Sequence, residues 1–194
     1  MRRLIAIILA CLLCLSLCAC EGTEGTAGKP KGSGVLIEDL QQAIKDFDDE
    51  GKLTVTEKED GFEFKYEGSI LLGDLIITGT ADKGKNLTQI SAKGTSINVS
   101  YFNSLTAGQL VNDMNNWEKV AMNKLSGEFM LWNFSYIVKI CSENNDSEAQ
   151  MAGLDILLAA RNSSKTSNGW TYTVKSDSSA DTVTINAVYN GDNK

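Results

Sequence analysis

The chain has 194 residues and a formal net charge of −7, with 25 acidic residues against 18 basic ones. An acidic protein repels polyanions, which argues against a nucleic-acid partner and against electrostatic docking on anionic lipid. The sequence contains no histidine, so catalytic triads, acid–base catalysis and zinc sites that depend on histidine are excluded.

The first twenty residues have the pattern of an export signal. Arg2 and Arg3 precede an almost unbroken apolar run over 4–17, which Ala19 and Cys20 follow. A charged head, an apolar stretch and a small residue at the cleavage point are the three parts of such a signal. The apolar run is shorter than the roughly 20 residues that a membrane-spanning helix needs.

The segment Leu17-Cys18-Ala19-Cys20 resembles the lipobox of bacterial lipoproteins. Cys20 alone among the early cysteines has both a small residue before it and a polar residue, Glu21, after it. The resemblance implies that Cys20 carries a diacylglyceryl group and becomes the first mature residue. Such a lipid holds a protein at the extracytoplasmic face of the cell membrane. The alternative is an ordinary secretory signal with an unrelated cysteine.

The rest of the chain is predicted to form one domain. We expect a signal peptide over 1–19, the lipidated cysteine and a flexible tether over 20–34, a globular domain over 35–190, and a frayed tail over 191–194. The tether is glycine-rich and holds the only proline of the chain, which is typical of a flexible linker.

The first half of the domain is predicted to be a helix followed by strands. Apolar residues at helical spacing predict a helix over 35–50. Alternating side chains predict a hairpin over 52–67, with Asp60-Gly61 in its turn. Strand patterns then recur in three segments, 69–81, 87–93 and 95–101.

Two acidic features of this half raise the question of a cation site. Acidic residues crowd the last turn of the first helix, where they oppose the helix dipole: Asp46, Asp48, Asp49 and Glu50. The connection 82–86 reads Asp-Lys-Gly-Lys-Asn, which resembles half of a calcium loop. A solvated helix end is the expected interpretation of the first. A plain turn is expected for the second, because it holds two lysines and no closing glutamate.

The second half is predicted to begin with helices. Thr106-x-x-Gln109 has the pattern of a capping box, and an apolar stripe continues to Leu125. Segment 128–142 alternates as a strand would, but its polar residues fall on one arc of a helical wheel and it is long for a strand. We therefore expect a helix there, with Ser126 as its N-cap and Gly127 as a break before it.

The chain then returns to strands. Ser147-x-x-Gln150 predicts the start of another helix, 162–168 is expected to be a polar loop, and 169–175 and 183–189 alternate as strands. The order of elements indicates an α+β fold with a single, mainly antiparallel sheet of about six strands and helices packed on one face. A helix followed by a hairpin occurs at 35–67 and again at 147–189, either by internal duplication or by chance.

Few residues suggest chemistry. Cleavage of the signal peptide and lipidation of Cys20 would leave Cys141 as the only free thiol of the mature chain. Cys141 lies on an apolar helix face, so we expect it to be buried. No phosphate-binding loop is present and no cofactor or metal is implied. Carboxylate-only catalysis, as in glycoside hydrolysis, stays open. The acids nearest apolar stretches are Asp74, Asp113, Glu118 and Asp155, and no pattern brings two of them together.

The aromatic residues provide the candidate contact surface. Trp132, Trp170 and Tyr172 are candidates for contact with a ligand or partner. The sequence thus predicts a lipid-anchored extracytoplasmic binding or interaction module without catalysis, whose ligand is a small molecule, a glycan or a protein. The alternatives are a carboxylate-based hydrolase acting at the cell envelope and a module that presents its sheet face to a protein partner or inhibits a target with it.

Overall fold

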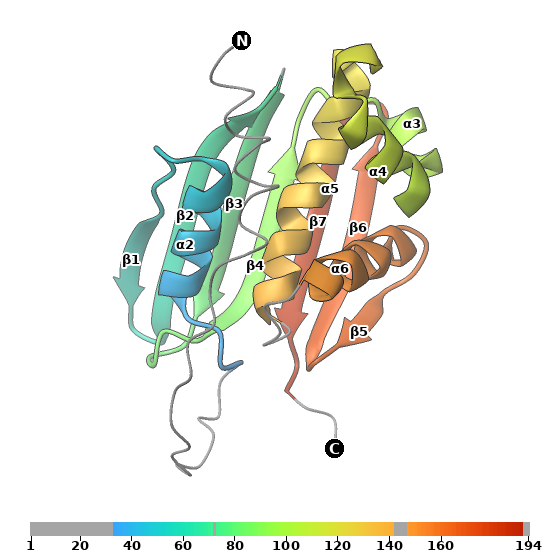
Figure 1. Cartoon of the computed structure of the whole chain (residues 1–194). Helices are drawn as coiled ribbons and strands as arrows, with labels where there is room; N and C mark the ends of the chain where they lie inside the picture. The colour runs from blue at the N-terminus through green and yellow to red at the C-terminus, as the bar shows by residue number, and fades with distance from the viewer. Residues whose placement is uncertain (1–32, 72, 142–146, 192–194) are drawn as a thin grey trace. The chain divides into compact units, whose positions relative to one another are not determined.

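The computed structural model describes residues 33–71, 73–141 and 147–191. The lipobox segment, Cys20 and nearly all of the tether lie outside these residues. Within them, seven strands form one antiparallel sheet (Figure 1). The strands are β1 Thr54–Lys58, β2 Gly61–Ile70, β3 Gly73–Ala81, β4 Leu87–Gly94, β5 Lys165–Ser167, β6 Trp170–Asp177 and β7 Thr182–Tyr189. Their order in the sheet is β1-β2-β3-β4-β7-β6-β5, which confirms the α+β prediction with seven strands in place of about six.

The helices lie on one face of this sheet, as Figure 1 shows for α2, α5 and α6. They are α2 Ile37–Phe47, α3 Val99–Ser104, α4 Ala107–Asn115, α5 Met122–Cys141 and α6 Ser147–Ala160, with a short 3-10 turn, η1 Trp117–Lys119. Strand alternation creates the surface they cover, since Val183, Ile185 and Ala187 of β7 are all buried. The core therefore lies between one face of the sheet and the helical layer.

The turn of the first hairpin differs from the prediction by one residue. Lys58 pairs with Gly61, so Glu59 and Asp60 form the turn and Gly61 begins β2. The glycine is needed for another reason, because a Cβ there would lie 2.1 Å from the carbonyl oxygen of Ala81 on β3. The close approach of β3 therefore explains why residue 61 is a glycine, although Gly61 is not part of the turn.

Segment 95–101 does not extend the sheet, contrary to the prediction. It leaves β4 and enters α3, where the side chain of Asn98 accepts a hydrogen bond from the backbone N–H of Tyr101. The capping box of α4 is confirmed, since Thr106 and Gln109 bond to each other's backbone N–H groups. The helix predicted to continue to Leu125 instead ends at Asn115.

Helix α5 runs through Ser126, which was predicted to be an N-cap, and through Gly127, which was predicted to be a break. Gly127 is interior to α5, and a Cβ there would lie 3.0 Å from the Phe102 side chain and 3.1 Å from that of Ile97. Ser126 is buried and its hydroxyl donates to the carbonyl of Met122. Here the small residues let α3 approach α5 closely, so they serve packing and not capping.

The helical assignment of 128–142 is confirmed up to Cys141, but the polar arc of this helix does not face solvent. Glu128 and Ser135 are both buried, because α5 packs between the sheet and other helices. Cys141 is buried in the core, as predicted.

The predicted loop 162–168 contains the short edge strand β5. Asn168 and Gly169 both have positive φ, 50° and 77°, which makes the tight turn that folds 165–167 beside β6. Helix α2 leads into the edge strand β1 and helix α6 into the edge strand β5. The two helix-then-hairpin segments therefore occupy corresponding places at opposite edges of the sheet.

Candidate functional site

The sheet face opposite the helices has no helix on it among the described residues (Figure 1). The antiparallel register sets its side chains in rows across the strands. One row is Lys65, Thr78, Ser91, Asn186 and Thr173. The next row is Glu63, Thr80, Gln89, Val188 and Thr171. The centre of this open face therefore consists mainly of hydroxyl and amide side chains.

Charges on the β1–β2 side of the open face are paired, whereas Lys93 of β4 and Lys175 of β6 lie on the same face in the row through Thr184 and add positive charge. Lys58 lies 3.1 Å from the Glu63 carboxylate, and Lys65 lies 2.6 Å from that of Glu67. The β1–β2 side of the face is therefore nearly neutral, although the chain as a whole is acidic. These exposed pairs add little stability, but they leave the β1–β2 side of the face without a strong electrostatic field of either sign.

An open hollow of about 550 Å³ lies on this face over β1 to β4. Its polar lining is Thr54, Thr56, Glu63, Lys65, Thr78, Thr80 and Gln89. Thr80 hydrogen-bonds Thr88 at 2.8 Å, whereas the side chains of Thr54, Thr56, Thr78 and Gln89 have no hydrogen-bond partner among the described residues. Those hydroxyl and amide groups are free to bind another molecule.

The aromatic candidates do not form an exposed surface, and this corrects the sequence prediction for two of the three. Trp170 and Tyr172 are 0% and 1% exposed and face the helices. Trp170 also packs against Tyr189, with ring centroids 5.5 Å apart. Strand alternation places Trp170 and Tyr172 on the same face of β6. Burying their large apolar area is favourable, so this face packs against the helices. Trp132 is partly buried and packs against the core.

The acidic end of α2 receives hydrogen bonds from two tyrosines. The hydroxyl of Tyr66 donates to Asp48 at 2.6 Å, and that of Tyr136 donates to Asp46 at 2.7 Å. These carboxylates therefore connect α2 to β2 and to α5. Among the described residues, no group of three histidine, cysteine or acidic side chains is placed to hold a metal ion.

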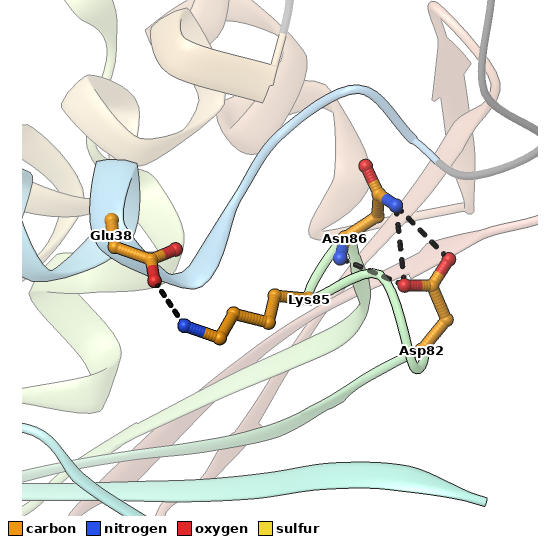
Figure 2. Close-up of polar contacts among 4 residues, drawn as sticks. All are labelled: Glu38, Asp82, Lys85 and Asn86. Atoms are coloured by element: carbon orange, nitrogen blue, oxygen red, sulfur yellow. Dashed lines mark hydrogen bonds and ion pairs between the residues drawn. The ribbon is translucent and has the colours of Figure 1, made fainter.

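The connection 82–86 is a turn closed by its own side chains, as Figure 2 shows. Asp82 accepts from the backbone N–H of Asn86 at 2.9 Å and from its amide group at 3.2 Å. Lys85 reaches Glu38 of α2 at 2.7 Å, and this hydrogen bond holds the pKa of Glu38 below its usual value. The predicted turn is present, and the Asp82 carboxylate accepts its hydrogen bonds from Asn86 of the same turn.

The structure brings one of the four predicted acids beside a second carboxyl group. Asp113 accepts a hydrogen bond from the hydroxyl of Tyr101, whose oxygen also lies 2.6 Å from Glu128 Oε1. Asp74, Glu118 and Asp155 share no such partner with another acid in the described part of the chain. Sequence reasoning missed Glu128 because it placed that residue on the polar arc of its helix.

The three groups of this cluster perturb one another. Burial raises the pKa of Glu128 to about 7. The hydrogen bond from Tyr101 holds the pKa of Asp113 below its usual value, and burial, followed by the two acceptor carboxylates, raises that of Tyr101. Neither acid lines the hollow over β1 to β4, so the pair is not set in that hollow as a glycosidase pair would be.

The thiol of Cys141 is not placed to react. Cys141 is fully enclosed, and burial raises its pKa to about 12. The thiolate is the reactive form of cysteine, so a nucleophilic role at neutral pH is disfavoured.

Comparisons with protein-family models, with curated proteins and with solved structures found no match. Among the described residues, no helix has both the length and the apolar character required to cross a bilayer. The candidate site with the broadest structural support is therefore the open face of the sheet, which is defined by the register of its strands.

Proposed function

We propose that this chain is a lipid-anchored, extracytoplasmic interaction module that binds a protein partner through the open face of its sheet. The observation that carries the proposal is a seven-stranded sheet with one face covered by helices and, in the part of the chain that the structure describes, no helix on the other. Strands about 4.8 Å apart and about eight residues long give a face of roughly 700 Å². A standard protein interface takes about 800 Å² from each partner, so the face is of suitable size.

The chemistry of the face favours a protein over the other ligand classes. Interface centres are poor in charge and their rims are polar, and the rows through Thr78 and Thr80 have this arrangement. Large aromatic side chains that could stack on sugar rings are buried on the opposite face at Trp170 and Tyr172. The hollow on the face is open and is not an enclosed pocket of the kind that buries a small ligand.

The lipobox resemblance supplies the location in this proposal. Lipid on Cys20 would hold the domain at the membrane, and a flexible tether of this length has a typical span of about 20 Å. That span lets the open face turn toward a partner in or near the membrane. Binding by hydroxyl and amide groups, with no catalytic step, is then the function.

Photocrosslinking of the full chain in its own host tests the face. A photoreactive residue is placed at Thr78 or Thr173 on the open face, and at Gln42 on the exposed side of α2 as the matched control. We expect a protein adduct, visible as a protease-sensitive mass shift, from both face positions and not from Gln42. Equal adducts from Gln42, or none from the face, would refute the proposal. A protease-resistant adduct sensitive to glycosidases would replace the protein partner by a glycan.

A further inference from the structure

The cluster of Tyr101, Asp113 and Glu128 needs one more proton than the phenol supplies. The Tyr101 oxygen is in hydrogen-bond contact with a carboxylate oxygen of each acid. A phenol carries a single hydrogen and can donate it to one acceptor only. Two ionised carboxylates would leave the other contact as two oxygen atoms with no hydrogen between them. The packing therefore requires that one of the acids is protonated.

Burial identifies Glu128 as the protonated acid. Its side chain is 0% exposed, and Oε2 has no hydrogen-bond partner among the described residues. Asp113 is partly exposed, and its other oxygen accepts from the Asn112 amide at 3.1 Å. The carboxylate charge is therefore better solvated on Asp113, and the cost of desolvation falls on the charged form of Glu128.

The charged groups around Glu128 do not offset a second negative charge. The groups that act on it are Tyr101 from α3, Asp113 from α4 and Lys124 from α5 itself. The Lys124 ammonium lies 4.7 Å from the centre of the Tyr101 ring, so it faces the cluster from one side. Arg161, the residue after α6, also approaches α3, but it donates to backbone carbonyls there. One positive charge faces the cluster, which balances one carboxylate.

Helix α4 packs against the core through few apolar side chains, so this cluster is a substantial part of its attachment. Leu110 is its one buried residue, Ala107 and Met114 are partly buried against the core, and Val111 is 36% exposed. Asp113 is on the same helix, two residues before its end at Asn115. The contact of Asp113 with Tyr101 therefore adds a polar attachment to a helix that has one fully buried apolar residue.

We propose that Tyr101, Asp113 and Glu128 form a proton-dependent latch that holds α4 against α3 and α5. With the proton on Glu128, each oxygen-to-oxygen contact of the cluster contains a hydrogen. When the proton leaves to solvent, two carboxylates face one phenol hydrogen in a buried site. Helix α4 then separates from α3 and α5 and exposes Leu110, while the sheet stays folded. This inference does not depend on the proposed binding function.

The direction of the pH effect follows from the burial of Glu128. Its pKa is raised to about 7 in the folded protein from a value of 4.5 without burial. A carboxyl group whose pKa is raised on folding stabilises the folded state most when the pH is below its unfolded pKa. That stabilisation is lost as the pH rises through its folded pKa. The latch is therefore closed in mildly acidic solution and opens as pH passes neutrality.

Hydrogen exchange of the full chain tests the latch. Protection of the amides of residues 107–115, corrected for the intrinsic effect of pH on exchange, is compared between about pH 5.5 and about pH 8.5. We expect protection in α4 to fall by about tenfold or more, while protection in β3 and β4 is unchanged. In Glu128→Gln the amide keeps a hydrogen to donate to the Tyr101 oxygen at every pH, which leaves the phenol hydrogen for Asp113, so protection in α4 should not change. Glu118→Gln, which removes an exposed acid outside the cluster, should behave as the wild type.

Three outcomes would overturn the latch. They are constant protection of α4 in the wild type, a pH effect retained in Glu128→Gln, and a parallel fall in β3 and β4, which would mean loss of the whole fold. If Glu128→Gln does not fold, Asp113→Asn serves instead, because with one carboxylate left the phenol hydrogen is sufficient. The pH effect should be lost in that variant, and its persistence would also overturn the proposal.

Discussion

Arg161→Ala is expected to lower the free energy of unfolding by about 3 kcal/mol, because several backbone carbonyls would lose a charged donor. The guanidinium donates to the carbonyl of Leu105 at 2.5 Å and to that of Leu158 at 3.1 Å, and it also donates to Phe102. These carbonyls lie at the C-terminal ends of α3 and α6, where the helix supplies few donors; the carbonyl of Phe102 also accepts from the backbone N–H of Leu105. Chemical denaturation of the purified protein measures the loss.

Two substitutions serve as controls for Arg161. Arg161→Lys keeps the charge but not the planar fork, so we expect an intermediate loss of stability. Lys175→Ala removes an exposed lysine from the open face and should change stability by no more than about 0.5 kcal/mol. A loss below about 1 kcal/mol in Arg161→Ala would mean that this side chain does not join α3 to α6.

Gly79→Ala is expected to destabilise the sheet by about 3 kcal/mol, although it adds one methyl group. A Cβ at Gly79 would lie 2.0 Å from the carbonyl oxygen of Gln89 and 2.4 Å from the Phe64 ring. Phe64 is its cross-strand partner, so the ring occupies the space that a side chain at Gly79 would need. The β3–β4 pair and the ring must both shift to admit the methyl, which is the cost of overpacking.

Gly108→Ala is the matched control for Gly79→Ala. Gly108 is in α4 and a Cβ there would meet nothing within 4 Å. The same substitution should therefore stabilise the protein by about 0.5 to 1 kcal/mol, since alanine favours helix more than glycine does. Both are measured by thermal or chemical unfolding. If Gly79→Ala were as stable as wild type, the position of the Phe64 ring over Gly79 would be wrong.

Local periodicity was sufficient to predict most elements and the fold class. The spacing of Leu40 and Ile44 indicated α2, and the alternation of Val183 and Ile185 indicated β7. Predictions failed where a distant contact decides the structure. Gly127 looked like a helix break, but it is a contact point for Phe102. Strand β5 was missed because its three residues form a strand only by pairing with β6.

The candidate site was predicted less well, for two physical reasons. Trp170 and Tyr172 were correctly placed on one strand face, but a single sequence does not say which face the helices cover. The same alternation directs Thr171 and Thr173 outward, and that signal was present. Glu128 was missed because charged residues are rarely buried, and because its partner Tyr101 is 27 residues away in the chain.

The proposed role requires that lipid on Cys20 holds the domain at the membrane. Fractionation of the host, with intact-mass measurement of the full-length product, tests this most directly in wild type and Cys20→Ser. We predict that the wild-type protein is in the membrane fraction with the added mass of a diacylglyceryl group. Cys20→Ser should be released into the soluble fraction without that mass. Retention of Cys20→Ser in the membrane, together with an unmodified wild-type mass, would contradict the lipid anchor and with it the proposed location.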